Sequence, residues 1–318
     1  MPEPILTLPG RVVEEQKNYY IVSTGKNYVR CTLKGTLLKK RNRICTGDAV
    51  HIQIINGDAH TDGHSRPPAP DLTAEGIICE ISPRQNFLPR PPLANLSQII
   101  FVNCFKHPRL DTEAIDRFLF SSTAYGVDAV IVFNKMDLLD DEEFSELEDI
   151  ERFYKNINYK IIHTSVPGEQ GIDNLTDLCK DKTSAFTGLS GVGKSSLLSL
   201  IFPGMEFKTS EVSGTHGRGT HTTTHTKLLS LDKDTFIADT PGFAFVDVPT
   251  VDEDTVIAHF PEIEAVTGQC RFNNCIHDNE PGCKVIEQVE AGEIAPWRHE
   301  HYLKIYQEMV KRRKMYEK

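Results

Sequence analysis

The chain has 318 residues, of which 39% are hydrophobic and 25% charged, and its formal net charge is −10 at pH 7. This length exceeds one typical core, so two or three domains are expected, and the acidic balance argues against a uniformly cationic nucleic-acid binder. Because no segment approaches the roughly 18 apolar residues of a membrane span and residues 1–10 lack the basic start of a secretory signal, we expect a cytoplasmic protein without a membrane partner.

Residues 1–92 contain short β segments separated by turn residues. β-branched residues and the alternation of apolar with polar residues predict five strands. These strands fall within the four segments 10–24, 26–35, 48–57 and 75–84. Residues 56–76 are rich in Gly, Pro, Asp and Ser and predict a long loop. Residues 1–55 carry nine Lys or Arg against four acids, so this region is locally basic. We expect an oligonucleotide-binding (OB) type of barrel, and an SH3-like barrel fits the same pattern.

Residues 93–246 consist of apolar runs that alternate with helical stretches. This βαβ rhythm is typical of buried parallel strands. We therefore expect a multidomain α/β protein whose central domain is doubly wound around a mostly parallel sheet. Residues 137–151 hold nine acids and no Lys or Arg, which indicates a solvated helix face.

Residues 247–318 form the third predicted domain, which is mainly helical. Its last helix is expected from about Pro296, because proline is favoured in a first helical turn. An apolar stripe along that helix predicts packing rather than recognition and comprises Trp297, His301 or Tyr302, Ile305 and Met309. The basic end at 310–318 suits the helix dipole without any ligand, and contact with RNA is the alternative.

A phosphate-binding loop is predicted at Gly188–Ser195 (GLSGVGKS), which matches G-x-x-x-x-G-K-[ST] between an apolar strand and a helix. Backbone N–H groups and the helix N-terminus would surround the phosphates. Lys194 would contact the β and γ phosphates, and Ser195 would ligate Mg²⁺. The expected nucleotide contacts are Gly188, Leu189, Ser190, Gly191, Val192, Gly193, Lys194, Ser195 and Ser196. The alternative interpretation of this segment is a glycine-rich turn that binds no phosphate and is followed by an unrelated lysine.

Guanine selection is predicted at the NKMD sequence, which comprises Asn134, Lys135, Met136 and Asp137. Asp137 can accept hydrogen bonds from the ring N–H and exocyclic amine of guanine, whereas adenine would leave this carboxylate unpaired at a cost of about 1 to 3 kcal/mol or more. The TSV sequence at 164–166 also ends a predicted strand. It would add backbone contacts to the base from Ser165 and Val166.

The DTPG sequence at 239–242 ends another predicted strand. Asp239 would hold Mg²⁺ through water, and the Gly242 N–H would reach the γ-phosphate. The Gly/Thr/His-rich stretch at 213–226 predicts a switch loop in which Thr223 completes the Mg²⁺ coordination. Phe243 stands where Ras-like GTPases place a water-orienting glutamine, so intrinsic hydrolysis should be slow. His221, favoured over His225, is expected to position the attacking water.

Four residues of types that bind metals lie within fourteen positions, namely Cys270, Cys275, His277 and Cys283. The spacing C-x4-C-x-H-x5-C and the turn residues around it predict a closed, structural Zn²⁺ site. Such a metal would support a segment too small to bury a full core alone. Buried cysteines without a metal are the alternative. The other cysteines are scattered, which favours reduced thiols.

The motif order is permuted, because NKMD and TSV precede the phosphate loop instead of following it. All of these elements end parallel strands, so one crevice can still form. The combination of the barrel, NKMD, TSV, GLSGVGKSS, GTHTTT, DTPGF and the Cys/His quartet resembles the circularly permuted GTPases of bacteria that depend on the small ribosomal subunit, the RsgA or YjeQ family.

The resemblance covers nearly the whole chain and implies several properties. A member of this family binds the small (30S) subunit late in its assembly and hydrolyses GTP to GDP and phosphate, and the subunit stimulates this hydrolysis. The resemblance also implies release of the mature particle and contact of the barrel with ribosomal RNA. It also places His221 and Thr223 at the family's catalytic histidine and switch threonine. Val166 and Gly219-Thr220 depart from the common family pattern, which bears on the guanine contacts.

Two other function classes fit parts of the sequence. An ATP-dependent enzyme or kinase could use the same phosphate loop, but NKMD argues against it. A non-catalytic RNA-binding scaffold with GTP locked in place is suggested by Phe243, and turnover measured with small subunits separates it from a GTPase. We expect a monomer that uses one Zn²⁺ per chain, and Mg²⁺ with GTP.

Overall fold

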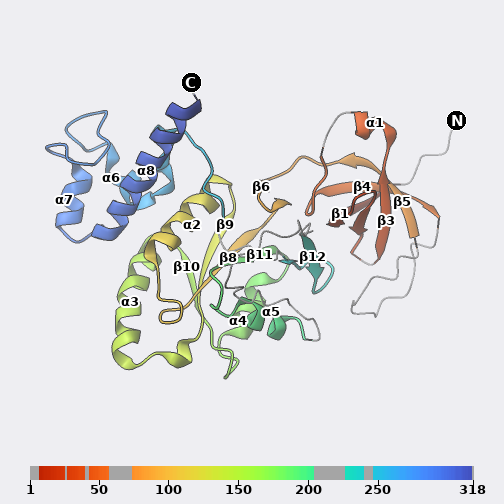
Figure 1. Cartoon of the computed structure of the whole chain (residues 1–318), viewed down its shortest axis with the longest axis horizontal. Coiled ribbons are helices and arrows are strands. Elements are labelled where there is room, and N and C mark those ends of the chain that lie inside the picture. The colour runs from red at the N-terminus through yellow and green to blue at the C-terminus, as the bar shows by residue number, and fades with distance from the viewer. Residues whose placement is uncertain are drawn as a thin grey trace, which may run out of the picture.

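The computed structural model describes residues 7–25, 27–39, 43–56, 74–203, 226–239 and 246–316. Figure 1 shows a β-barrel on the N-terminal side, a central sheet flanked by helices, and a helical unit that contains the C-terminus. Within these ranges, no helix is both long and apolar enough to cross a membrane.

The barrel is built from β1 (Leu8–Glu15), β2 (Tyr20–Ser23), β3 (Tyr28–Leu33), β4 (Ala49–Asn56) and β5 (Ala74–Ile81). The strands follow the order β1-β2-β3-β5-β4, and a β1–β4 pairing closes the barrel. Alternating apolar residues fill its interior, including Val12, Val22, Val29, Ile52 and Ile78. This topology confirms the OB-type barrel. The short helix α1 (Gly35–Lys39) was not expected from the sequence.

The central sheet contains β8 (Gln98–Asn103), β9 (Asp128–Phe133), β10 (Lys160–His163), β11 (Thr183–Thr187), β12 (Lys227–Ser230) and β13 (Phe236–Asp239). Their order is β10-β9-β8-β11-β13-β12. The pairs are parallel except β12–β13, so the mostly parallel sheet is confirmed. All six residues of β8 are buried, as expected for a strand covered on both faces.

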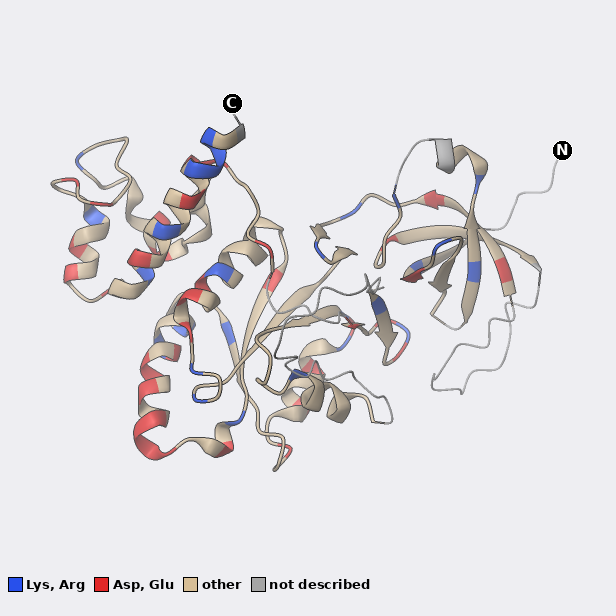
Figure 2. Cartoon of the chain, viewed as in Figure 1, with Lys and Arg blue, Asp and Glu red and all other residues tan. Residues whose placement is uncertain are grey.

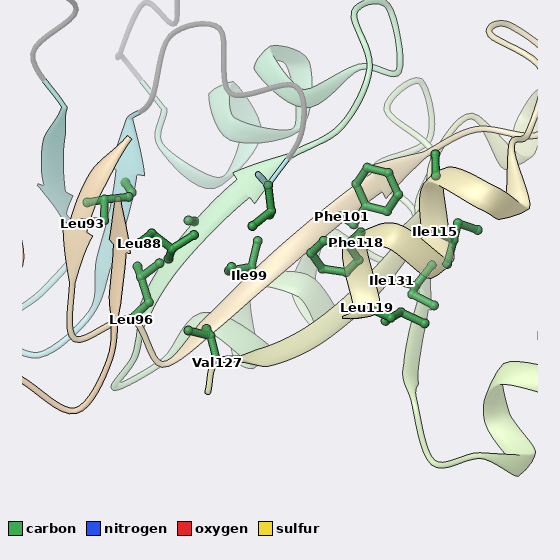
Figure 3. Packing of buried hydrophobic residues seen from close by; sticks show 14 of the residues in the cluster. Leu88, Leu93, Leu96, Ile99, Phe101, Ile115, Phe118, Leu119, Val127 and Ile131 are labelled. Carbon is green, nitrogen blue, oxygen red and sulfur yellow. The ribbon is translucent and has the colours of Figure 1, made fainter. Parts of the chain in front are cut away.

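The helices of the central unit are α2 (Thr112–Ala124), α3 (Asp141–Asn156), α4 (Ile172–Cys179) and α5 (Lys194–Ile201), with a 3-10 turn η1 (Met136–Leu138). α3 starts at a capping box in which Asp140 and Glu143 satisfy each other's backbone N–H. In Figure 3, α2 packs on β8, and the rings of Phe101 and Phe118 lie 4.7 Å apart. This packing fixes β8 at the centre of the fold.

The barrel and the central sheet are continuous, because β1 pairs with β12 at Glu14 and Lys227. The Lys227 Nζ also lies 2.9 Å from Glu14 Oε1. The hairpin β6 (Phe87–Pro89) and β7 (Pro92–Ala94) follows the barrel, and its Leu88 and Leu93 share a buried cluster with the central strands (Figure 3). We keep 1–92, 93–246 and 247–318 as a proposed division of this connected fold.

The C-terminal unit consists of η2 (Glu253–His259), α6 (Pro261–Thr267), α7 (Lys284–Glu290) and α8 (Pro296–Tyr316). Tyr302, Ile305 and Met309 are buried on α8, so the predicted apolar stripe serves packing. Phe120 of α2 belongs to the same cluster. The helical unit is therefore packed directly on the central one.

Candidate guanine-nucleotide site

The phosphate loop leaves the buried strand β11 and ends where α5 begins at Lys194. Gly188, Gly191 and Gly193 have φ angles of 140°, 84° and 97°, which side chains rarely adopt. A Cβ on Gly188 would lie 2.2 Å from the Val102 carbonyl oxygen, and one on Gly193 would lie 2.3 Å from Asn134 Nδ2. The glycines therefore allow both the turn and its close approach to the neighbouring strands.

Lys194 is held by its own loop. Its Nζ donates to the carbonyl oxygens of Gly188 at 2.6 Å and Leu189 at 2.8 Å. Burial lowers the pKa of Lys194, and an anionic phosphate would favour its charged form. Ser195 follows at the first turn of α5, half-buried, and Ser196 is exposed. The loop thus presents an ammonium group and a helix N-terminus to one small region.

Asn134 connects the guanine motif to the phosphate loop. It follows β9, is 2% exposed, and donates from Nδ2 to the Val192 carbonyl at 2.8 Å. Its Oδ1 accepts a 3.0 Å hydrogen bond from Thr164 Oγ1. One buried amide therefore joins the end of β9 to the residue after β10 and to the phosphate loop, which are far apart in the sequence.

Asp137 lies beside the TSV sequence. The Ser165 hydroxyl donates to Asp137 Oδ1 at 2.5 Å, and the Met136 N–H donates to the Thr164 carbonyl at 3.2 Å. Lys135 adopts a left-handed φ of 64°. These contacts orient the carboxylate that would accept hydrogen bonds from guanine, and they bring NKMD and TSV together as predicted.

The structure gives fewer details for the other predicted site residues, and some of them lie outside the described residues. Asp239 is half-buried at the end of β13, which runs parallel to the strand that carries the phosphate loop. Val166 is partly buried against the cluster beneath α4 and α5. His221, Thr223, Gly242 and Phe243 lie outside the described residues.

Sequence reasoning missed a buried acid behind this site. Glu151 of α3 is 1% exposed, and its carboxylate is hydrogen-bonded by His163, the residue before Thr164, and by Lys155 at 2.7 Å. Burial alone would raise the pKa of Glu151, but these hydrogen bonds outweigh it and lower the pKa. The available signal was spacing, because Glu151 lies four residues after Leu147 on the buried helix face.

The predicted metal ligands converge in the C-terminal unit. One ligand atom from each of Cys270, Cys275, His277 and Cys283 lies within 4.8 Å of the others. His277 Nδ1 is 3.6 Å from the Cys270 sulfur and 3.4 Å from the Cys283 sulfur. Three thiols and one imidazole at this spacing fit a closed tetrahedral ion. The structure thus shows a cluster that could hold a metal.

The loop around this cluster is fixed from two sides. The Glu280 carboxylate accepts from the N–H groups of Ile276 at 2.8 Å and Asp278 at 2.9 Å. The His299 Nε2 on α8 is 2.6 Å from the His277 carbonyl oxygen. The loop is therefore tied to the helix that also contacts the central unit.

A buried network of charged side chains joins the central unit to the C-terminal unit. Arg298 of α8 is fully buried and donates to Asp116 of α2 at 2.6 Å and to Glu262 of α6 at 2.7 Å. The Tyr154 hydroxyl and the His301 ring each lie 2.7 Å from Asp116. These groups compensate one another's charges inside the protein. No local sequence pattern pointed to them.

Comparisons with known proteins point to one family of GTPases. Residues 81–249 match the family described as RsgA GTPase. A small ribosomal subunit biogenesis GTPase RsgA from Moorella thermoacetica is 39% identical over 94% of this chain and 96% of the relative. A protein of the same name from Carboxydothermus hydrogenoformans is 39% identical over 95% and 98%, respectively.

Two solved structures are similar along nearly their whole length. YjeQ from Thermotoga maritima is 34% identical with a TM-score of 0.78, covering 96% of this chain and 99% of that one. YloQ, described as a circularly permuted GTPase, is 28% identical with a TM-score of 0.77 and covers 98% of each chain. The permuted motif order therefore occurs on a known GTPase fold.

Proposed function

Because this chain belongs to the RsgA GTPase family and is a GTP-hydrolysing enzyme, we propose that it binds the small ribosomal subunit and acts in its late maturation. Its relatives are named for biogenesis of that subunit. The observation that carries the nucleotide part of the proposal is the hydrogen bond from Asn134 to Val192, which holds the NKMD motif against the phosphate loop. GTP is hydrolysed to GDP and phosphate, and the subunit stimulates this step.

Different residues of the site bind the base, the phosphates and Mg²⁺. Asp137, oriented by Ser165, accepts hydrogen bonds from the base, while Lys194 and the loop N–H groups contact the phosphates. Ser195, Thr223 and Asp239 would hold Mg²⁺, which neutralises negative charge on the phosphates. The Gly242 N–H is proposed to reach the γ-phosphate. Binding is then specific for guanine and dependent on phosphate.

The water that attacks the γ-phosphate is positioned by His221 in this proposal. Phe243 cannot hydrogen-bond water, so another group is needed, and imidazole can serve near neutral pH. We expect His221→Ala to abolish the stimulation by subunits while leaving GDP affinity unchanged, with His225→Ala as the matched control. An unchanged stimulated rate in His221→Ala would remove this role.

The remaining assignments follow the same proposal. The Cys/His cluster holds one structural Zn²⁺, because its donor set and spacing match closed zinc sites. The barrel contacts ribosomal RNA, since residues 1–55 are locally basic. At the end of α8, Arg312 bonds to the Val248 carbonyl and Arg313 pairs with Glu253, so both contact the protein itself. The chain acts as a cytoplasmic monomer.

The deciding experiment is GTP hydrolysis by the full chain with small subunits, with large subunits, or with neither. The proposal expects slow turnover alone and strong stimulation by small subunits only. Equal rates in all three mixtures would contradict it. Tight GTP binding with no turnover in any mixture would favour the non-catalytic scaffold instead.

A further inference from the structure

A cleft of about 840 Å³ lies between the barrel and the hairpin β6–β7. Arg43 and the segment 81–84 line it from the barrel side, and Phe87, Pro89 and Pro92 line it from the hairpin. Its volume falls in the range of about 300 to 1,000 Å³ that is typical of ligand clefts. The cleft is separate from the nucleotide site, because none of the motif residues lines it.

Arg84 is fixed at one wall of this cleft. Its Nε and Nη2 donate to the buried Asp48 carboxylate at 2.7 and 2.9 Å, and Nη2 also donates to the Arg43 carbonyl at 2.7 Å. The guanidinium carbon lies 4.6 Å from the ring centre of Phe87. The guanidinium plane and the ring are therefore held together before any ligand arrives.

Phe87 is a large apolar side chain that is 38% exposed. With the prolines and Arg84 it forms flat, weakly hydrated surface, on which unpaired nucleobases stack. No Asp or Glu occurs among the described residues that line the cleft. Arg43 is the last residue of the KKRNR run, whose positions 40–42 lie outside the described structure. Figure 2 shows Lys and Arg on the segments joining the barrel to the hairpin.

We infer that this cleft binds an unpaired base of single-stranded RNA, stacked on Phe87, with the adjoining phosphate facing Arg43. The inference rests on the proposed function, because the small subunit supplies the RNA. Arg84 is already paired with the buried Asp48, so the cleft attracts a phosphate through Arg43. The exposed ring of Phe87 suits a nucleobase, which favours RNA over a peptide. A peptide occupant is left as an outcome of the test below.

The occupant is identified by crosslinking. The full chain, with p-benzoyl-phenylalanine in place of Phe87, is bound to small subunits with a non-hydrolysable GTP analogue and irradiated. We expect a crosslink to ribosomal RNA. The matched control carries the same group in place of Phe144, which is also 38% exposed but lies on the acidic helix α3. A crosslink from position 87 only to ribosomal protein, or no crosslink, would overturn the inference.

Affinity gives a second readout. Fluorescence anisotropy with a fluorescein-labelled twelve-nucleotide oligouridylate should show binding roughly five- to a hundredfold weaker for Phe87→Ala. Arg43→Ala, at an exposed position, should also weaken it, and Phe144→Ala should match the unmodified chain. Equal affinities for Phe87→Ala and Phe144→Ala, or no binding by the unmodified chain, would overturn the inference. Absence of stimulation of the unmodified chain by small subunits would instead overturn the proposed function.

Discussion

Asn134 and Val192 are 58 positions apart, yet the Asn134 amide donates to the Val192 carbonyl at 2.8 Å. This contact determines how the base-reading motif sits against the phosphate loop. Asn134 also accepts a hydrogen bond from the Thr164 hydroxyl. Removing the amide therefore leaves the Val192 carbonyl and the Thr164 hydroxyl without this hydrogen-bond partner.

We therefore predict that Asn134→Ala weakens GDP binding by roughly five- to 150-fold, the effect of losing about 1 to 3 kcal/mol. Equilibrium binding of a fluorescent GDP analogue measures the change. Asn174→Ala, at an exposed position on α4, is the control and should bind like the unmodified chain. An unchanged affinity for Asn134→Ala would show that the two motifs assemble without this amide.

Glu151 should make stability depend on pH. Hydrogen bonds from His163 and Lys155 lower its pKa when the protein is folded, so its contribution is present above the unfolded value of about 4.3. It is lost as pH falls through the lower folded pKa. The stability advantage of the unmodified chain over Glu151→Gln should therefore shrink below about pH 4.3.

Urea unfolding at several pH values tests this expectation. Glu148→Gln, at an exposed position on the same helix, should change stability little at any pH. A difference between Glu151→Gln and the unmodified chain that stays constant down to pH 3 would contradict the lowered pKa.

The Arg298 network should dominate the coupling between the central and C-terminal units. Arg298→Met leaves Asp116 and Glu262 buried without their shared cation, which should destabilise the protein by roughly 3 to 5 kcal/mol. The control is Arg152→Ala, whose ion pair with Asp149 is exposed and should be worth about 0 to 1 kcal/mol. Urea unfolding measures both, and equal effects would contradict this role for Arg298.

Metal removal tests the Cys/His cluster. Elemental analysis should find one zinc per chain, and Cys283→Ser should lose it, whereas the buried Cys104 lies outside the cluster and Cys104→Ser should keep it. Chelation should unfold the loop at 270–283 and weaken the packing of α8, because metal binding and folding are coupled. A chain that is free of metal and equally stable would refute a structural metal.

Several features could be predicted because they depend on local sequence. The phosphate loop requires glycines at fixed spacing, and the metal ligands fall within fourteen positions. Strand ends in a parallel sheet meet at one edge, so NKMD, TSV and the loop could be placed together despite their permuted order. Asn134, Ser165 and Lys194 are found where this reasoning puts them.

Other features depend on contacts that no local pattern encodes. Arg298 and Asp116 are 182 positions apart, and only the packing of α8 on α2 brings them together. Glu151 belongs to an acidic run expected to be solvated, yet its helix turns it toward His163. α1 has only five residues, which is too short for a clear helical period.

The central claim is that separated motifs form one guanine-selective site, and competition binding with Asp137→Asn tests it most directly. The unmodified chain should prefer GDP over ADP strongly, and the variant should lose most of this preference because the amide cannot accept both guanine N–H groups. A variant that still discriminates GDP from ADP as well as the unmodified chain would contradict the account.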